Sequence, residues 1–240
     1  MNRFALVPPA AAALVVGLLG CGDNLTLPGP TQTGLELTVL GGNGQIGTVG
    51  QELEKPVVVV VLNAARLPVP NRKVVFAPTG TATGAFDPDT AMTDAQGKAL
   101  THWVLGTVPG SYTGEARVVP LDDSIPAPVP FEATANAGSP DSVRADSPTI
   151  QNGRRGEPVD QPLVVKVVDR YGNPVPNVQV TWRAELGNGD LSPASGNVTD
   201  ADGRCGVVWT LGNRIGIQQV TAEIPDLIGS PVTFSATVLF

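Results

Sequence analysis

The stretch DRYGNPVPNVQVTW at residues 169–182 decides the fold of this chain. In its second half Val178, Val180 and Trp182 alternate with polar residues, which is the pattern of a strand with one buried face. Its first half, DRYGNP, is typical of a tight turn, because Asp bonds its own backbone and Gly accepts a positive φ. The stretch therefore predicts a turn followed by a strand that places Trp182 in a core.

The same pattern occurs twice in the chain, at a constant offset of 106 residues. The matching positions are Pro56 and Pro162, Pro68 and Pro174, Thr93 and Thr199, and Trp103 and Trp209. An offset that survives in separate segments indicates two copies of one folding unit, and a unit of this length has a core of its own. We expect the first domain at residues 35–137 and the second at residues 138–240.

Composition favours an all-β fold. The chain has 28 Gly and 23 Pro in 240 residues and is rich in Val and Thr, which suits short strands joined by turns. The run at 57–62 does not alternate, but its second copy has Lys166 where the first has Val60, so this parity faces outward. We therefore expect an all-β chain of two tandem antiparallel β-sandwiches. The residues expected to face the cores are Val57, Val59, Val61, Cys205, Val207, Trp209 and Leu211.

Turn residues specify the connections. Asp200-Ala201-Asp202-Gly203 fits a type I turn that ends in Gly at a positive φ. The turn at 169–174 has a Gly, but its first copy at 63–68 has none, which predicts a different turn shape there.

The N-terminus predicts a cellular address. Arg3 is followed by an apolar run at 4–19 that is too short and too broken by Pro to span a membrane, as in a secretory signal peptide at residues 1–20. The run ends in LLGC, which resembles the lipobox of bacterial lipoproteins and implies lipid attachment at Cys21. Residues 21–34 then form a Pro- and Gly-containing tether. No Asp directly follows the Cys, which by resemblance to enterobacterial sorting signals favours the outer membrane or cell surface.

The motifs at 169–182, 199–203 (TDADG), 209–212 (WTLG) and 231–237 (PVTFSAT) together resemble bacterial immunoglobulin-like domains of group 1, found in invasin and intimin. The resemblance covers nearly all of the second copy and shorter segments of the first. It implies that each copy is an immunoglobulin-like sandwich of about seven or more antiparallel strands. It also implies no catalysis and a role as a spacer, adhesion or protein-interaction module.

Charge and residue inventory exclude several functions. The net charge is −7 and no segment is a basic cluster, so we expect no nucleic-acid partner. His102 is the only His and lies on an outward parity, which leaves no catalytic triad and no zinc ligand set. With Cys21 lipidated, Cys205 has no disulfide partner, and we expect a small buried thiol. We expect no enzyme activity and no cofactor.

An alternative function uses the acidic loops. Segments 87–89, 122–123 and 200–203 each carry two Asp, and calcium prefers carboxylate oxygens. The alternative is therefore a calcium- or glycan-binding envelope protein.

One difference between the copies suggests a protein partner. The first domain carries apolar residues at outward positions where the second is mostly polar or small, and exposed apolar patches often mark interaction surfaces. The pairs are Val60 and Lys166, Val75 and Thr181, Leu100 and Gly206, and Val104 and Thr210. We expect the outer face of the first domain to pack on a protein partner, on a second copy of the chain or on a covering loop; the sequence assigns no oligomeric state.

Overall fold

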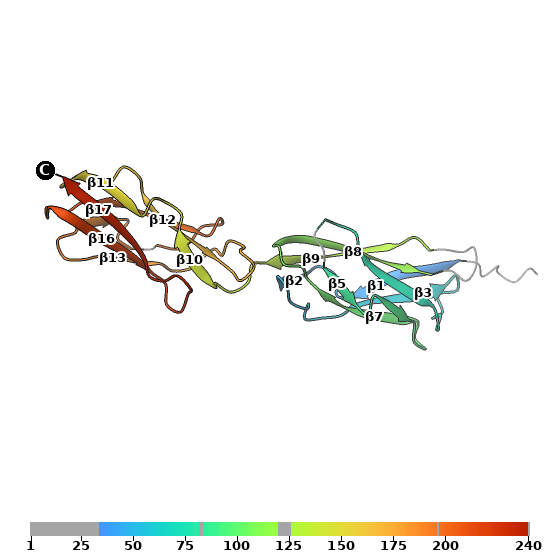
Figure 1. The fold of residues 1–240 in the computed structure, drawn as a ribbon. Coiled ribbons are helices and arrows are strands. Elements are labelled where there is room, and N and C mark those ends of the chain that lie inside the picture. Colours follow the sequence, from blue (N-terminus) through green and yellow to red (C-terminus); the bar gives the residue numbers. More distant parts are fainter. Residues whose placement is uncertain (1–33, 82–83, 120–125, 196, 240) are drawn as a thin grey trace, which may run out of the picture. The chain divides into compact units, whose positions relative to one another are not determined.

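The computed structural model describes residues 34–81, 84–119, 126–195 and 197–239, and these form two β-sandwiches (Figure 1). Each sandwich has its own hydrophobic cluster, from Leu37 to Ala135 in the first and from Val143 to Val238 in the second. Among the described residues, no helix is long and apolar enough to cross a membrane. Cys21 and the expected signal peptide lie outside these ranges.

The first sandwich contains nine described strands. One sheet has the order β1-β3-β7-β5, and the other has the order β2-β9-β8-β4-β6. All pairs are antiparallel except β2 with β9, which is parallel. The strands are β1 (Leu35–Gly41), β2 (Gln45–Thr48), β3 (Val57–Asn63), β4 (Lys73–Pro78), β5 (Ala85–Asp87), β6 (Thr90–Met92), β7 (Lys98–Val104), β8 (Gly110–Val118) and β9 (Val129–Asn136).

The second sandwich repeats this plan, except that in the described residues the pairing of β4 with β6 is represented by a single bridge between Gln179 and Val198. Its sheets have the orders β10-β12-β15-β14 and β11-β17-β16-β13, with β11 parallel to β17. The predicted all-β class with immunoglobulin-like antiparallel sandwiches is confirmed. The strands are β10 (Ser142–Ala145), β11 (Ile150–Arg154), β12 (Leu163–Val168), β13 (Thr181–Ala184), β14 (Asp190–Ser192), β15 (Arg204–Thr210), β16 (Gly216–Glu223) and β17 (Val232–Leu239).

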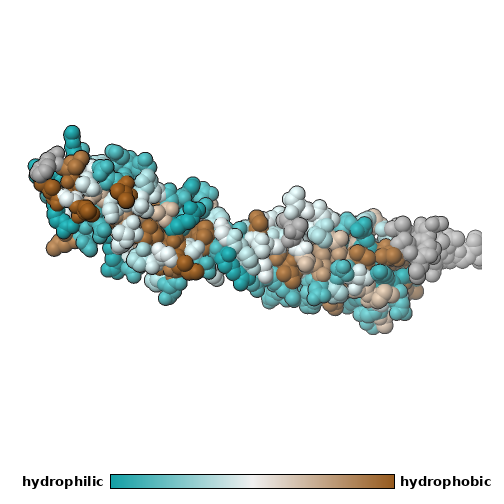
Figure 2. Space-filling view, viewed as in Figure 1, coloured by the Kyte–Doolittle hydropathy of each residue, from teal (hydrophilic) through white to brown (hydrophobic). Residues whose placement is uncertain are grey.

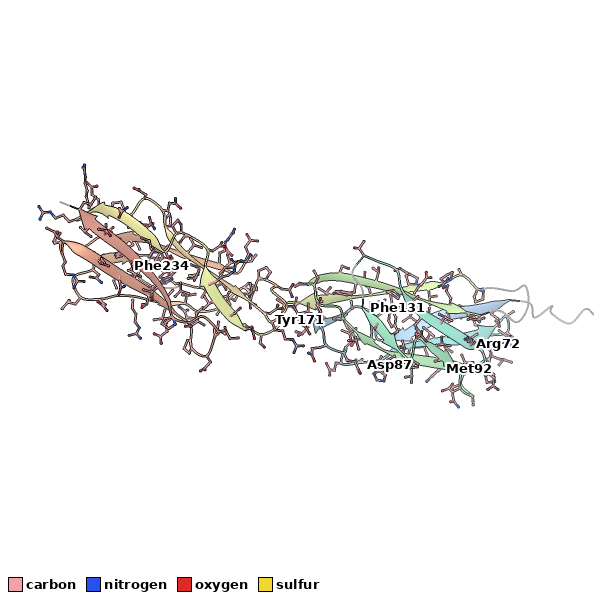
Figure 3. All side chains as sticks on the ribbon, viewed as in Figure 1. Arg72, Asp87, Met92, Phe131, Tyr171 and Phe234 are labelled. Atoms are coloured by element: carbon pink, nitrogen blue, oxygen red, sulfur yellow. The ribbon has the colours of Figure 1, made fainter. Side chains whose placement is uncertain are left out.

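The core positions follow the predicted parities. Trp103 and Trp209 are fully buried at matching places on β7 and β15, and all seven residues expected to face the cores are buried. Trp182 faces the second core but is only partly buried. Aromatic rings fill the space between the sheets, with Phe131 in the first sandwich and Phe234 in the second (Figure 3). Each such side chain contributes about 1.5–3 kcal/mol on burial.

The turn at residues 63–68 contradicts its prediction. Arg66 adopts a φ of 59°, and the Asn63 side-chain oxygen accepts hydrogen bonds from the backbone N–H groups of Ala65 and Leu67. The second copy has the same arrangement, with Asp169 as acceptor and Gly172 at a φ of 85°. The expectation of a different shape was wrong, because a left-handed non-Gly residue costs only about 1–2 kcal/mol.

A buried side chain fixes the loop before β8 and before β16. In the first sandwich the Tyr112 hydroxyl donates to the Val108 carbonyl at 2.7 Å, the arrangement of a tyrosine corner. In the second sandwich Gln218 occupies the matching position and donates to the carbonyls of Gly212 and Arg214. Different side chains thus satisfy the same need, which is a partner for loop backbone groups that would otherwise be unpaired.

Candidate functional site

The structure divides the predicted apolar surface of the first sandwich between two sheets. Val60, Leu100 and Val104 lie on β3 and β7, but Val75 lies on β4 in the opposite sheet. Parity along a strand distinguishes inward from outward positions, but it does not say which sheet the strand joins. The four residues therefore cannot form one surface, which corrects the composition of the expected interaction face.

Val60 is also a poor member of an exposed surface, because only 7% of it is accessible. It lies opposite Thr38 on β1 and Lys98 on β7, and a Lys stem can cover a neighbouring apolar side chain. Leu100 is 48% exposed, and Leu40, which the sequence comparison missed, is 54% exposed.

Leu40 is exposed because the pairing of β1 with β3 is irregular between Val39 and Gly41. A bulge of this kind leaves one residue unpaired and redirects its side chain. We use the name Leu face for the exposed and half-buried apolar residues on the outer side of the β1-β3-β7-β5 sheet. Its members are Leu40, Val58, Leu100 and Val104. Figure 2 shows apolar residues in separate groups among hydrophilic ones on the side that it draws.

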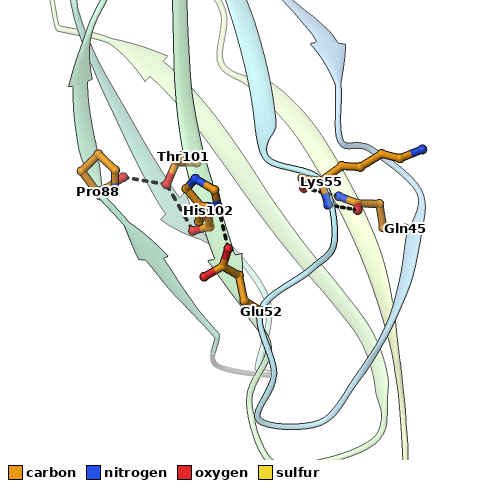
Figure 4. A network of polar contacts seen from close by, with 6 residues as sticks. All are labelled: Gln45, Glu52, Lys55, Pro88, Thr101 and His102. Carbon is orange, nitrogen blue, oxygen red and sulfur yellow. Dashed lines mark hydrogen bonds and ion pairs between the residues drawn. The ribbon is translucent and has the colours of Figure 1, made fainter.

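His102 lies on the outer side of β7 between Leu100 and Val104. Its Nδ1 is 2.6 Å from Glu52 Oε1, and both side chains are about half exposed (Figure 4). Glu52 also forms an isolated bridge with Val104, so the contact ties the loop before β3 to β7. Among the described residues, the ring's only hydrogen bond joins it to this carboxylate, which orients an imidazole but is not the hydroxyl or thiol of a triad.

The acidic turns use their carboxylates locally. Asp200 Oδ1 accepts from the backbone N–H groups of Asp202 and Arg204 at 2.9 Å, and Asp94 does the same for Gln96 and Lys98 at 2.8 Å. Within the described ranges, no three His, Cys, Asp or Glu side chains gather as a metal site. The pair at 122–123 lies outside them. Calcium binding by these loops thus stays a prediction that no contact in the described residues supports.

The remaining candidate residues are buried or bonded to the backbone. Cys205 is buried, and burial raises the pKa of its thiol, which disfavours the reactive thiolate. The loop at 187–189 is bonded to β15 and β16. Buried Asn188 donates through its side chain to the Gln219 carbonyl, and its backbone oxygen accepts from Trp209 Nε1 at 2.7 Å. In the loop at 42–44, Asn43 accepts from the Glu132 backbone.

The second sandwich matches a known family. Residues 160–237 match the bacterial Ig-like domain (group 1) family, which confirms the resemblance on which the fold was predicted. No curated protein matches the chain.

Solved structures are similar in fold. FdeC, described as an adhesin of Escherichia coli, has a TM-score of 0.50 and 16% identity over 85% of this chain and 64% of its own. InvD of Yersinia pseudotuberculosis has a TM-score of 0.50 and 18% identity over 87% of this chain and 58% of its own. The chain thus spans less than two thirds of either structure, and the likeness establishes the fold alone.

Proposed function

We propose that this chain is a non-enzymatic, lipid-anchored protein of the bacterial cell envelope, at the outer membrane or cell surface. Its two immunoglobulin-like sandwiches act as a spacer that carries adhesive or protein-interaction surfaces. The match of residues 160–237 to the bacterial Ig-like domain (group 1) family carries the proposed interaction role, and the lipobox-like sequence that ends at Cys21 supports the anchor. The description of FdeC as an adhesin supports the interaction role.

The anchor is tested at Cys21. Cells expressing the full chain are fed an alkyne-bearing palmitate analogue, and incorporation into the protein is measured. We expect labelling of the wild type and of Cys205→Ala, because Cys205 is buried and its counterpart in the first sandwich is Ala99. Cys21→Ala should abolish labelling. Labelling that survives Cys21→Ala would contradict the anchor.

The surface location is tested on intact cells with an added protease and a periplasmic marker. We expect loss of the full-length chain while the marker stays intact. Protection of both proteins would place the sandwiches inside and redirect the search to a periplasmic partner.

The Leu face is the proposed partner surface of the first sandwich. Changing Leu40 and Leu100 to Lys should abolish association with cell-surface proteins and leave the melting temperature nearly unchanged, because both side chains are about half exposed. Val75→Lys on the opposite sheet is the control and should have no effect on association. Association that survives the Leu40 and Leu100 changes would remove the Leu face as the partner surface.

A further inference from the structure

A row of three basic residues crosses the outer side of the β10-β12-β15-β14 sheet. In the strand register Arg144 lies opposite Lys166, and Lys166 lies opposite Arg204. The residues come from three strands that are distant in the sequence, so a search for basic segments does not find them. The absence of a basic segment from the sequence therefore did not exclude a basic surface. We call these three residues the basic row.

Negative charges lie at both ends of the basic row, since Asp146 follows β10 and Asp200 and Asp202 precede β15. Arg204 Nε is 2.6 Å from Asp146 Oδ2, with side-chain exposures of 50% and 18%. The hydrogen bond from Arg204, aided by the charges of Arg204, Arg144 and Lys166, lowers the pKa of Asp146. Asp200 and Asp202 also act on Arg204 and raise its pKa, after the larger effect of Asp146. In the part of the chain that the structure describes, Arg144 and Lys166 form no ion pair.

The first sandwich shows that the fold does not need this arrangement. Thr38, Val60 and Lys98 occupy the same register there. Like charges directly opposite each other on neighbouring strands are destabilising. Asp146 offsets part of this repulsion, and the matching positions of the first sandwich show that the fold forms without Arg144 and Lys166.

The position next to the basic row carries a smaller side chain in the second sandwich than in the first. Val164 lies opposite Gly206 in the adjacent register position, whereas the first sandwich has exposed Leu100 in place of Gly206. A Cβ at Gly206 would lie 3.2 Å from Val164 Cγ2, so the half-buried Val164 side chain covers this position and no side chain as large as Leu100 projects from it. Outward-facing residues of β10, β12, β15 and β14 include no aromatic ring on which a nucleobase could stack.

We propose that Arg144, Lys166 and Arg204 bind a linear anionic polysaccharide that runs across β10, β12 and β15. Neighbouring strands are about 4.8 Å apart, which is close to the length of one sugar residue, so acidic groups on successive sugars meet cations on successive strands. Arg binds a carboxylate or sulfate through two parallel N–H groups. The inference rests on the proposed interaction role and names its ligand class. A test on the purified chain is independent of the lipid anchor.

The test measures binding of the purified full chain to heparin, with dextran as the neutral polymer and a single-stranded DNA oligonucleotide as the competing polyanion, at low and physiological salt. The variant R144T/K166V installs the residues of the first sandwich, which the same fold already accommodates. The control R154Q/R155Q removes the same charge from exposed positions at the end of β11 in the other sheet.

We expect heparin to bind the wild type, and R144T/K166V to weaken binding about tenfold or more and to reduce the salt dependence by close to two charges. The control should change affinity by less than about twofold, a loss typical of long-range charge alone. R144T/K166V should melt close to the wild type, since it removes both the repulsion among the three cations and the attraction of Arg144 and Lys166 to Asp146.

Three results would overturn the proposal. These are no heparin binding at low salt, equal weakening in both variants, or DNA binding as tight as heparin binding. Each leaves the labelling of Cys21 unaffected, so failure here is distinguishable from failure of the proposed anchor.

Discussion

Replacing Asp169 by Asn should destabilise the second sandwich far more than the same change at Asp200. Asp169 is 2% exposed and accepts four hydrogen bonds. One oxygen accepts from the backbone N–H groups of Tyr171 and Asn173, and the other accepts from the Gly138 N–H at 2.8 Å and from Asn173 Nδ2 at 2.9 Å. An Asn side chain keeps the first pair, as Asn63 does in the first sandwich, but it places an NH₂ group against the two donors of the second pair.

The expected loss of unfolding free energy follows from the two hydrogen bonds that Gly138 and Asn173 Nδ2 donate. A hydrogen bond to a charged group contributes about 1.5–3 kcal/mol, so two such losses predict about 3–4 kcal/mol once Gly138 relaxes toward water. Asp200→Asn is the matched control, because Asp200 accepts both of its hydrogen bonds on one oxygen, which an amide retains. Its loss should stay below about 1 kcal/mol.

The effect also depends on pH. Burial acts to raise the pKa of Asp169, but hydrogen bonds from the Asn173 side chain and from the backbone of Gly138, Asn173 and Tyr171 outweigh it, so the pKa is lowered from its ordinary value of 3.8. A lowered folded-state pKa contributes stability that is fully present above the unfolded-state pKa and is lost as the pH falls through the folded-state value. The difference between wild type and Asp169→Asn should therefore be constant near neutral pH and shrink below about pH 4.

Urea unfolding followed by Trp fluorescence measures the difference. A Trp103→Phe background leaves Trp182 and Trp209, both in the second sandwich, as the only Trp residues. Equal stability of Asp169→Asn and Asp200→Asn, or a difference that grows in acid, would refute the assignment of the Asp169 carboxylate as a buried, ionised acceptor.

Two further changes test backbone and loop contacts. Gly189→Ala should destabilise the second sandwich by more than about 2 kcal/mol, because Gly189 has a φ of 93° and a Cβ there would clash with the Thr210 carbonyl. The control Gly187→Ala has open space around the added Cβ and should show only the smaller strain of a left-handed residue. Thermal melting compares the two variants. Gln218→Ala should lower the free energy of unfolding by about 2–3 kcal/mol, because it leaves backbone groups of Gly212 and Arg214 unpaired. The control Gln219→Ala changes an exposed side chain and should lower it little. Hydrogen exchange at residues 212–216 would locate the effect, and equal exchange in both variants would contradict it.

Sequence patterns predicted the parts of the fold that alternation and turn chemistry determine. Lys166 identified the outward parity of β12 and, through the repeat, of β3. The Asp200 turn formed as expected because its Gly203 has a φ of 71°. The turn at Asn63 was misjudged because the sequence shows a missing Gly but not the strain that Arg66 tolerates.

The surfaces were harder to predict than the cores, because they depend on which strands become neighbours. Nothing in the sequence places Val75 on the sheet opposite Leu100, or Arg144 beside Lys166. The bulge that exposes Leu40 is likewise a property of strand pairing. An internal repeat removes part of this difficulty, since each strand pair in one copy has a counterpart in the other.

The repeat also separates what the fold requires from what it permits. Most inward positions stay apolar in both copies, as at Trp103 and Trp209, and Gln218 in place of Tyr112 is an exception. On the outer side of the corresponding sheets, the register is preserved while the chemistry changes, from Thr38 and Leu100 to Arg144 and Gly206. One backbone thus presents an apolar face in one sandwich and a basic row in the other. Since a single ligand chemistry does not suit both surfaces, the proposed Leu face contact and the proposed polysaccharide contact are separate proposals.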